Sequence, residues 1–149
     1  MKASLSAEAL AEYLSDRAIE ASVIDDGFVA LPLPGSDDVA TLRTEGGWIV
    51  FKMLVAEIRG GPSLQALRNL NRIHDRLIGL RFSVVDEEVW VIQDFPLEIL
   101  NDDFYLYIDH VFAVLENILQ PLRASVDGST ELSEEEIDAL FGFGAVSTH

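Results

Sequence analysis

The stretch Trp48-Ile49-Val50-Phe51-Lys52-Met53-Leu54-Val55-Ala56 is apolar at every position except Lys52. It is much shorter than the roughly 20 residues that cross a bilayer. A nearly continuous apolar run of this length is typical of a well-covered strand. Gly60-Gly61-Pro62 follows closely and breaks the chain. We therefore expect residues 48–58 to form the central strand of a sheet.

Turn-forming residues separate the apolar stretches on both sides of this strand. Asp25-Asp26-Gly27 lies between residues 21–24 and 28–33, and glycine accepts the positive φ that a tight hairpin turn needs. Gly46-Gly47 and Asp86-Glu87-Glu88 mark two further hairpins. Strands joined by tight turns run antiparallel, so the sequence predicts a mainly antiparallel sheet of about five strands.

Three longer helical patterns alternate with these strands. Ser6 and Ser63 are expected N-caps of the first two, and Leu64 and Leu67 are expected on the inward face of the second. Pro121 is expected to end or kink the third. The predicted order is α-β-β-β-α-β-β-α with a short C-terminal helix, which is an α+β fold with helices on one face of the sheet.

Composition narrows the classes of partner. The chain has 149 residues and a formal net charge of −16, with 26 acidic against 10 basic side chains. This charge repels nucleic-acid phosphate and anionic lipid headgroups, so neither nucleic acid nor membrane is an expected partner. Cysteine is absent, which excludes disulfides and thiolate chemistry. We expect a soluble, cytoplasmic protein.

The sequence divides into an expected domain at residues 1–125 and an acidic tail at 126–149. The tail has six acidic residues and no basic one. Ser133 and Glu136 have the spacing of a capping box. A narrow apolar stripe follows, made by Ile137, Leu140 and Phe141. Such a short helix is marginal alone, so it either docks into a partner's groove, packs on its own domain, or frays.

Arginines recur every four residues along the second predicted helix. Arg68, Arg72 and Arg76 drift by only about 40° per step and form one stripe. Two interpretations stay open: a solvated face that balances nearby carboxylates, or a docking site for an acidic peptide or for the chain's own tail. Arginine suits the second because its planar fork pairs bidentately with carboxylates.

Catalytic constellations are missing from the sequence. His74 and His110 each neighbour an aspartate, but adjacent residues on a helix point about 100° apart and do not form a base with its orienting carboxylate. There is no phosphate-binding loop and no nucleophile motif. We expect no enzyme, no cofactor and no metal, although a small-ligand site or an enzyme would follow if the histidines converged with carboxylates around a cavity.

The order of elements resembles the type III secretion chaperone-like fold, and within it the YbjN-type domains, described as candidate regulators of bacterial sensory transduction. The likeness rests on residues 9–14, the Asp26-Gly27 hairpin, and residues 48–55, 67–80 and 89–95, and it covers about residues 5–124. It implies a non-enzymatic domain, often a homodimer, that holds an extended segment of another protein against its sheet and helix surface.

Residues 132–141 resemble a second, much shorter sequence. They are similar to the segment of flagellar motor switch proteins that binds the phosphorylated chemotaxis response regulator, which typically reads L-S-Q-x-E-I-D-A-L-L. Glu134 replaces the glutamine and Phe141 the last leucine. The resemblance implies, as an alternative function, docking to a chemotaxis-type response regulator through this segment.

The sequence thus predicts a protein-binding module, chaperone-like or a signalling adaptor, and the resemblance implies that it forms a homodimer. Its partner is expected to be another protein or a peptide segment. The residues expected to bind it are Arg68, Arg72, Arg76, Ile137, Leu140 and Phe141.

Overall fold

The computed structural model describes residues 5–25, 27–77, 79–100, 103–127 and 131–141, and it confirms the α+β class. The helices are α1 (Ala7–Ser15), α2 (Leu64–His74), α3 (Phe104–Asp127) and α4 (Glu134–Leu140), with a 3-10 turn η1 (Leu97–Ile99). The strands are β1 (Ser22–Asp25), β2 (Phe28–Pro32), β3 (Val39–Glu45), β4 (Trp48–Glu57), β5 (Arg81–Val85) and β6 (Glu88–Pro96).

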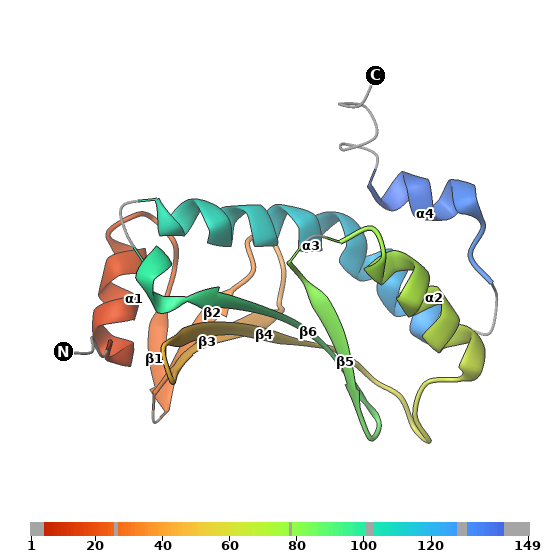
Figure 1. The fold of residues 1–149 in the computed structure, drawn as a ribbon, viewed down its shortest axis with the longest axis horizontal. Helices are drawn as coiled ribbons and strands as arrows, with labels where there is room; N and C mark the ends of the chain where they lie inside the picture. Colours follow the sequence, from red (N-terminus) through yellow and green to blue (C-terminus); the bar gives the residue numbers. More distant parts are fainter. Residues whose placement is uncertain (1–4, 26, 78, 101–102, 128–130, 142–149) are drawn as a thin grey trace. The chain divides into compact units, whose positions relative to one another are not determined.

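The strands form one antiparallel sheet in the order β1-β2-β3-β4-β6-β5, labelled in Figure 1. The expected central position of β4 is confirmed, since it lies between β3 and β6. The described sheet has six strands where about five were expected, and four of them precede α2. The hairpin expected between residues 21–24 and 28–33 is present as β1 and β2, and β1 is a four-residue edge strand whose pairing with β2 is irregular between Val23 and Asp25.

Burial alternates along β4 instead of covering the whole strand. Ile49, Phe51, Met53 and Val55 are buried, whereas Trp48 is 48% exposed. Alternation of this kind belongs to an antiparallel sheet with one covered face. The residues between the buried ones are only half-buried, so the nearly continuous apolar run overstated how fully the strand is covered.

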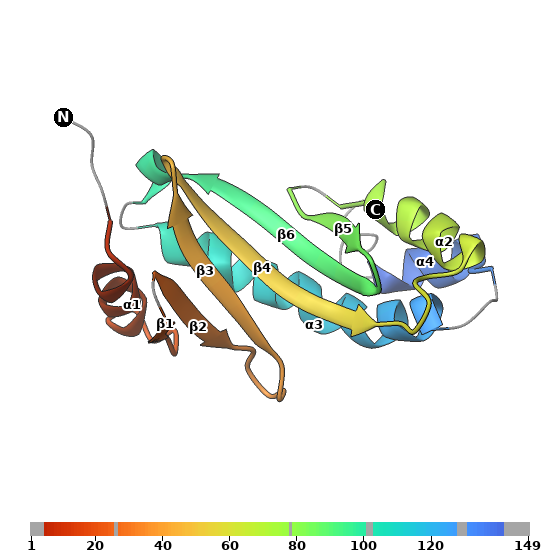
Figure 2. The ribbon, with the colours of Figure 1, turned by 90° about the horizontal axis from the view of Figure 1, so that it is seen from below.

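The chain forms two compact units, and the first comprises residues 1–53 and 92–112. Here Val29, Leu42 and Phe51 lie opposite one another on β2, β3 and β4 and are fully buried. The strands β1, β2 and β3 lie side by side in Figure 2. Helix α1 contacts β1 and β2, and the Tyr13 hydroxyl accepts a hydrogen bond from the backbone N–H of Tyr105 at 3.2 Å.

The second unit comprises residues 54–91 and 113–149. Its part of α3 contains Pro121, and the helix continues to Asp127. Of the two effects expected of Pro121, an end of the helix is therefore wrong, and a kink stays a prediction. A proline inside a helix costs about 3 kcal/mol, but Ile118, Leu122 and Val126 are all buried, and their packing keeps the segment helical on both sides of the proline.

Three predicted N-caps are confirmed. The Oγ atoms of Ser6, Ser63 and Ser133 accept hydrogen bonds from backbone N–H groups three residues later, at 3.1, 3.1 and 3.0 Å. The face of α3 that follows the helical spacing of apolar residues in the sequence is buried as well, comprising Phe104, Ile108, Val111, Phe112, Leu115, Ile118 and Leu119. Among the described helices, none is both long and apolar enough to span a membrane. The division into residues 1–125 and 126–149 stays a prediction.

Candidate functional site

Helix α2 carries most of the residues that could bind a partner. Its buried stripe comprises Ala66, Asn69, Leu70 and Ile73. Leu64 and Leu67 were expected to face inward, but they are 63% and 40% exposed. With about 100° between successive residues, the buried stripe separates two flanks of α2. We call them the arginine flank (Arg68 and Arg72, continued by Arg76 in the turn just after α2) and the groove flank (Leu67, Asn71, His74).

The acidic segment at residues 131–141 lies on the arginine flank, where α4 runs beside α2 (Figures 1 and 2). Arg72 Nη2 is 2.8 Å from Glu134 Oε2, and Arg76 Nη2 is 3.5 Å from Glu134 Oε1. Arg76 also pairs with Asp138. Glu134 and Asp138 are one helical turn apart and match the spacing of the two arginines, so the ion pairs fix the register of α4 along α2.

Hydrogen bonds to the backbone hold the start of this segment. Arg72 Nη1 donates to the carbonyl oxygen of Leu132. Asn69 Oδ1 accepts from the backbone N–H of Leu132 at 3.1 Å and from Gln65 Nε2 at 3.3 Å. Both polar groups of the Leu132 peptide backbone are thereby bonded to α2, which positions Ser133 to cap α4.

Asn69 is the one functional residue here that the sequence reasoning missed. Its side chain is fully buried, and it is the only polar residue in the buried class among those described. Its sequence signal was an asparagine at a position of the buried stripe, between Ala66 and Leu70. A buried amide needs hydrogen-bond partners; one of them is Gln65 on the same helix, and the other is the Leu132 backbone, 63 residues away.

The predicted binding residues are only partly brought together. Ile137 and Leu140 are 1% and 7% exposed, and Phe141 is half-buried. Arg72 and Arg76 pair with the acidic segment, but Arg68 forms no ion pair with any residue that the structure describes. Arg68 instead lines a hollow of about 240 Å³ together with Gln65, Asn71, Arg72 and Glu131.

The groove flank faces β5, and the hollow between them is mainly apolar. Leu67, Leu70, His74, Phe82 and Val84 line most of a hollow of about 160 Å³. The rings of His74 and Phe82 have centroids 6.0 Å apart. Strand β5 is the last strand in the sheet order, so one side of its backbone is an edge, and Val84 and Val85 are 41% and 51% exposed there.

The histidines do not form a common site with carboxylates in the described structure. His74 is exposed and packs against Phe82, and His110 is exposed on the part of α3 that belongs to the other unit. No group of three or more histidine or acidic side chains among the described residues could hold a metal ion.

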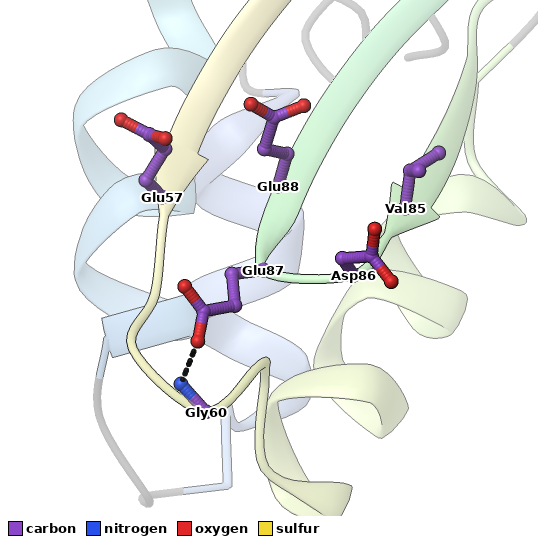
Figure 3. A pocket seen from close by; sticks show the side chains of 6 residues that line it. All are labelled: Glu57, Gly60, Val85, Asp86, Glu87 and Glu88. Atoms are coloured by element: carbon purple, nitrogen blue, oxygen red, sulfur yellow. Dashed lines mark hydrogen bonds between the residues drawn. The ribbon is translucent and has the colours of Figure 1, made fainter.

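An acidic hollow of about 570 Å³ lies at the turn between β5 and β6 (Figure 3). Glu57, Asp86, Glu87 and Glu88 line it, but Figure 3 shows their carboxylates pointing in different directions. Glu87 Oε2 accepts from the backbone N–H of Gly60 at 2.8 Å. This contact ties the turn to the loop after β4, so the side chain has a structural role.

The fold defined by this order of elements is the type III secretion chaperone-like fold, as the sequence resemblance implied. Two solved structures share it. One is a chain of the heterodimeric complex ExoU–SpcU from the type III secretion system of Pseudomonas aeruginosa, with a TM-score of 0.55 and 12% identity over 76% of this chain and 96% of that one.

The other is YbjN of E. coli, described as a candidate transcription regulator, with a TM-score of 0.58 and 16% identity over 79% of this chain and 89% of that one. No family model and no curated protein matches the chain by sequence. At these identities the comparison establishes the fold. The likeness of residues 132–141 to the flagellar segment stays a prediction.

Proposed function

We propose that this chain is a non-enzymatic protein-binding module, chaperone-like or a signalling adaptor, that holds an extended apolar segment of another protein along β5 and the groove flank of α2. The observation that carries the proposal is an apolar hollow lying directly beside an open strand edge. The hollow is lined by Leu67 and Leu70 of α2 and by Phe82 and Val84 of β5.

Such a surface can bind an extended chain in two ways at once. The free edge of β5 offers backbone N–H and C=O groups to a further strand, and this supplies affinity without selecting a sequence. Phe82 and Val84 are two residues apart on a strand and therefore lie on the same face. Alternate side chains of the bound segment would meet them and Leu67, which favours a segment with apolar residues at every second position.

The fold neighbours support this class of function. One of them is a chain of a heterodimeric complex of the type III secretion system, so a domain of this shape is known to associate with another protein. The described residues hold no cluster that could bind a metal ion, and neither His74 nor His110 converges with carboxylates around a hollow formed by the described residues. These observations favour binding over catalysis, and we expect the location to be cytoplasmic.

A peptide-display selection tests the proposal. Peptides of about 12 random residues are selected against the full chain, and the affinities of the enriched peptides are then measured for Val84→Lys and Val23→Lys variants. The two valines are matched controls, because each lies on an edge strand and they are 41% and 39% exposed. A lysine at a strand edge disfavours strand addition.

We expect the selected peptides to alternate apolar and polar residues. Val84→Lys should weaken their binding at least about tenfold, and Val23→Lys should leave it within about twofold. Peptides that bind both variants equally would place the site elsewhere on the chain.

Self-association also stays a prediction. A second copy could pair with the same edge of β5, and the resemblance implied a homodimer. Light scattering coupled to size-exclusion chromatography measures the mass directly. If the unmodified protein has the mass of two chains and Val84→Lys has the mass of one, the β5 edge binds a second copy of the chain. That result would contradict a segment of another protein as its main occupant.

A further inference from the structure

The acidic segment on the arginine flank is held by few contacts. Helix α4 has seven residues, and Ile137 and Leu140 are its only buried residues. The acidic partners of the arginines remain largely open to solvent, with Glu131 and Glu134 side chains 73% and 74% exposed. A helix this short depends on the surface against which it docks, and exposed ion pairs contribute little each. A helix of another protein with the same pattern of charges can therefore displace the segment from the arginine flank.

The arginine flank also has one arginine, Arg68, that forms no ion pair with the described part of this segment. Arg68 precedes Arg72 by one helical turn and lines the hollow of about 240 Å³ beside Glu131. The sequence ahead of Glu131 is Gly128-Ser129-Thr130, which carries no charge. A segment with one more carboxylate ahead of the position of Glu131 would reach all three arginines.

We propose that the arginine flank of α2, with Asn69, is a docking surface for an acidic amphipathic helix of another protein, and that residues 131–141 are its built-in competitor. This inference rests on the proposed function only in taking the chain to be a protein-binding module. The partner helix carries carboxylates four residues apart, as in Glu134 and Asp138, and apolar residues at the positions of Ile137 and Leu140. It carries a further acidic residue nearer its start, which pairs with Arg68.

Two features of the chain favour such a partner over general attraction to acidic peptides. The net charge of −16 repels acidic peptides from most of the surface. Asn69, in contrast, bonds one backbone N–H in a defined place. Binding at this surface therefore requires both the arginine stripe and a chain that presents its backbone to the buried amide, and this combination selects a capped helix start such as that of Ser133.

The test uses the full chain and a fluorescein-labelled peptide with the sequence of residues 131–141, measured by fluorescence anisotropy. A double variant, Ile137→Asp with Leu140→Asp, releases the segment from α2. A second release variant, Glu134→Lys with Asp138→Lys, reverses the ion pairs and leaves the apolar side chains in place. We expect the peptide to bind both release variants at least about tenfold more tightly than the unmodified chain, because the competitor is gone.

Substitutions in α2 then locate the surface. In the release background, Arg72→Glu should weaken binding at least about tenfold, whereas Arg59→Glu, an exposed arginine outside α2, should change it by less than about twofold. A peptide extended by two glutamates at its N-terminus should bind about threefold or more tightly than the original, and Arg68→Ala should abolish that gain.

Several results would overturn the inference. Equal binding to the unmodified chain and to both release variants would show that residues 131–141 do not compete. Equal binding of a scrambled peptide of the same composition would show that charge alone accounts for the binding. A two-chain mass that is lost in the release variants would mean that the occupant is the same segment of a second copy. Val84→Lys should not affect this peptide, so failure here and failure of the proposed function are separable.

Discussion

Replacing Asn69 by leucine should detach the acidic segment from α2 while leaving the rest of the fold intact. The side chain is fully buried among Ala66, Leu70 and Ile73, and leucine is apolar and branches at Cγ as asparagine does. The helix therefore keeps its packing. The backbone N–H of Leu132 loses its acceptor at 3.1 Å and stays unpaired for as long as the segment remains docked.

The size of the effect follows from that unpaired group. Leaving a donor without its partner costs about 1–3 kcal/mol, which corresponds to a shift of roughly 5- to 150-fold in the docking equilibrium. Gln65 Nε2 also loses its bond to Asn69, but Gln65 is only half-buried and can bond to water. The shift in the docking equilibrium should therefore lie within this range.

Amide hydrogen exchange measured by mass spectrometry reports the shift, because α4 amides exchange through local opening. Exchange in residues 132–141 should accelerate by that factor, and exchange in β2, β3 and β4 should not change. His74→Leu is the control, since His74 is exposed on the groove flank of the same helix. Unchanged exchange in α4, or equal acceleration by His74→Leu, would refute the assignment of Asn69 as the anchor.

Three further results are expected. Raising sodium chloride from 0.05 to 0.5 M should accelerate exchange in α4, because exposed ion pairs are screened over a few ångströms at high salt. Arg76→Gln should reduce this salt sensitivity. A rate independent of salt would show that the ion pairs do not hold α4 on α2. Pro121→Ala should raise the free energy of unfolding by about 1–3 kcal/mol in urea titrations, since it restores a donor inside α3, and a lower midpoint would contradict this reading of the helix. If the flagellar resemblance is functional, an activated chemotaxis receiver domain should bind the unmodified chain only after α4 leaves α2. Asn69→Leu should then tighten binding, and deletion of residues 128–149 should abolish it. Binding that survives the deletion excludes this alternative.

Features set by local sequence were predictable. The serine caps and the capping box at Ser133 and Glu136 involve residues three apart, and these contacts form wherever the helix forms. The central place of β4 and the buried face of α3 followed from apolar patterns long enough to leave no competing arrangement. In each case, the sequence pattern and the final packing favour the same structure.

Features set by distant contacts were less accessible. Leucine periodicity in α2 did not reveal that Leu64 and Leu67 lie outside the buried stripe, because two overlapping apolar arcs fit the same helix. Pairing of the arginines with the chain's own acidic segment was one of two open interpretations, and it joins residues 62 apart. Pro121 shows the same limit, since tertiary packing outweighs a local preference.

The central claim is that the chain holds a segment of another protein at β5 and the groove flank. Site-specific photocrosslinking tests it most directly, with a photoreactive phenylalanine derivative placed at Val84 or, as the control, at Val23 of the full chain in its native cell. We predict that position 84 crosslinks to one defined segment of another protein and that position 23 does not. Crosslinks from position 84 that reach only the chain itself, or the same products from both positions, would contradict the claim.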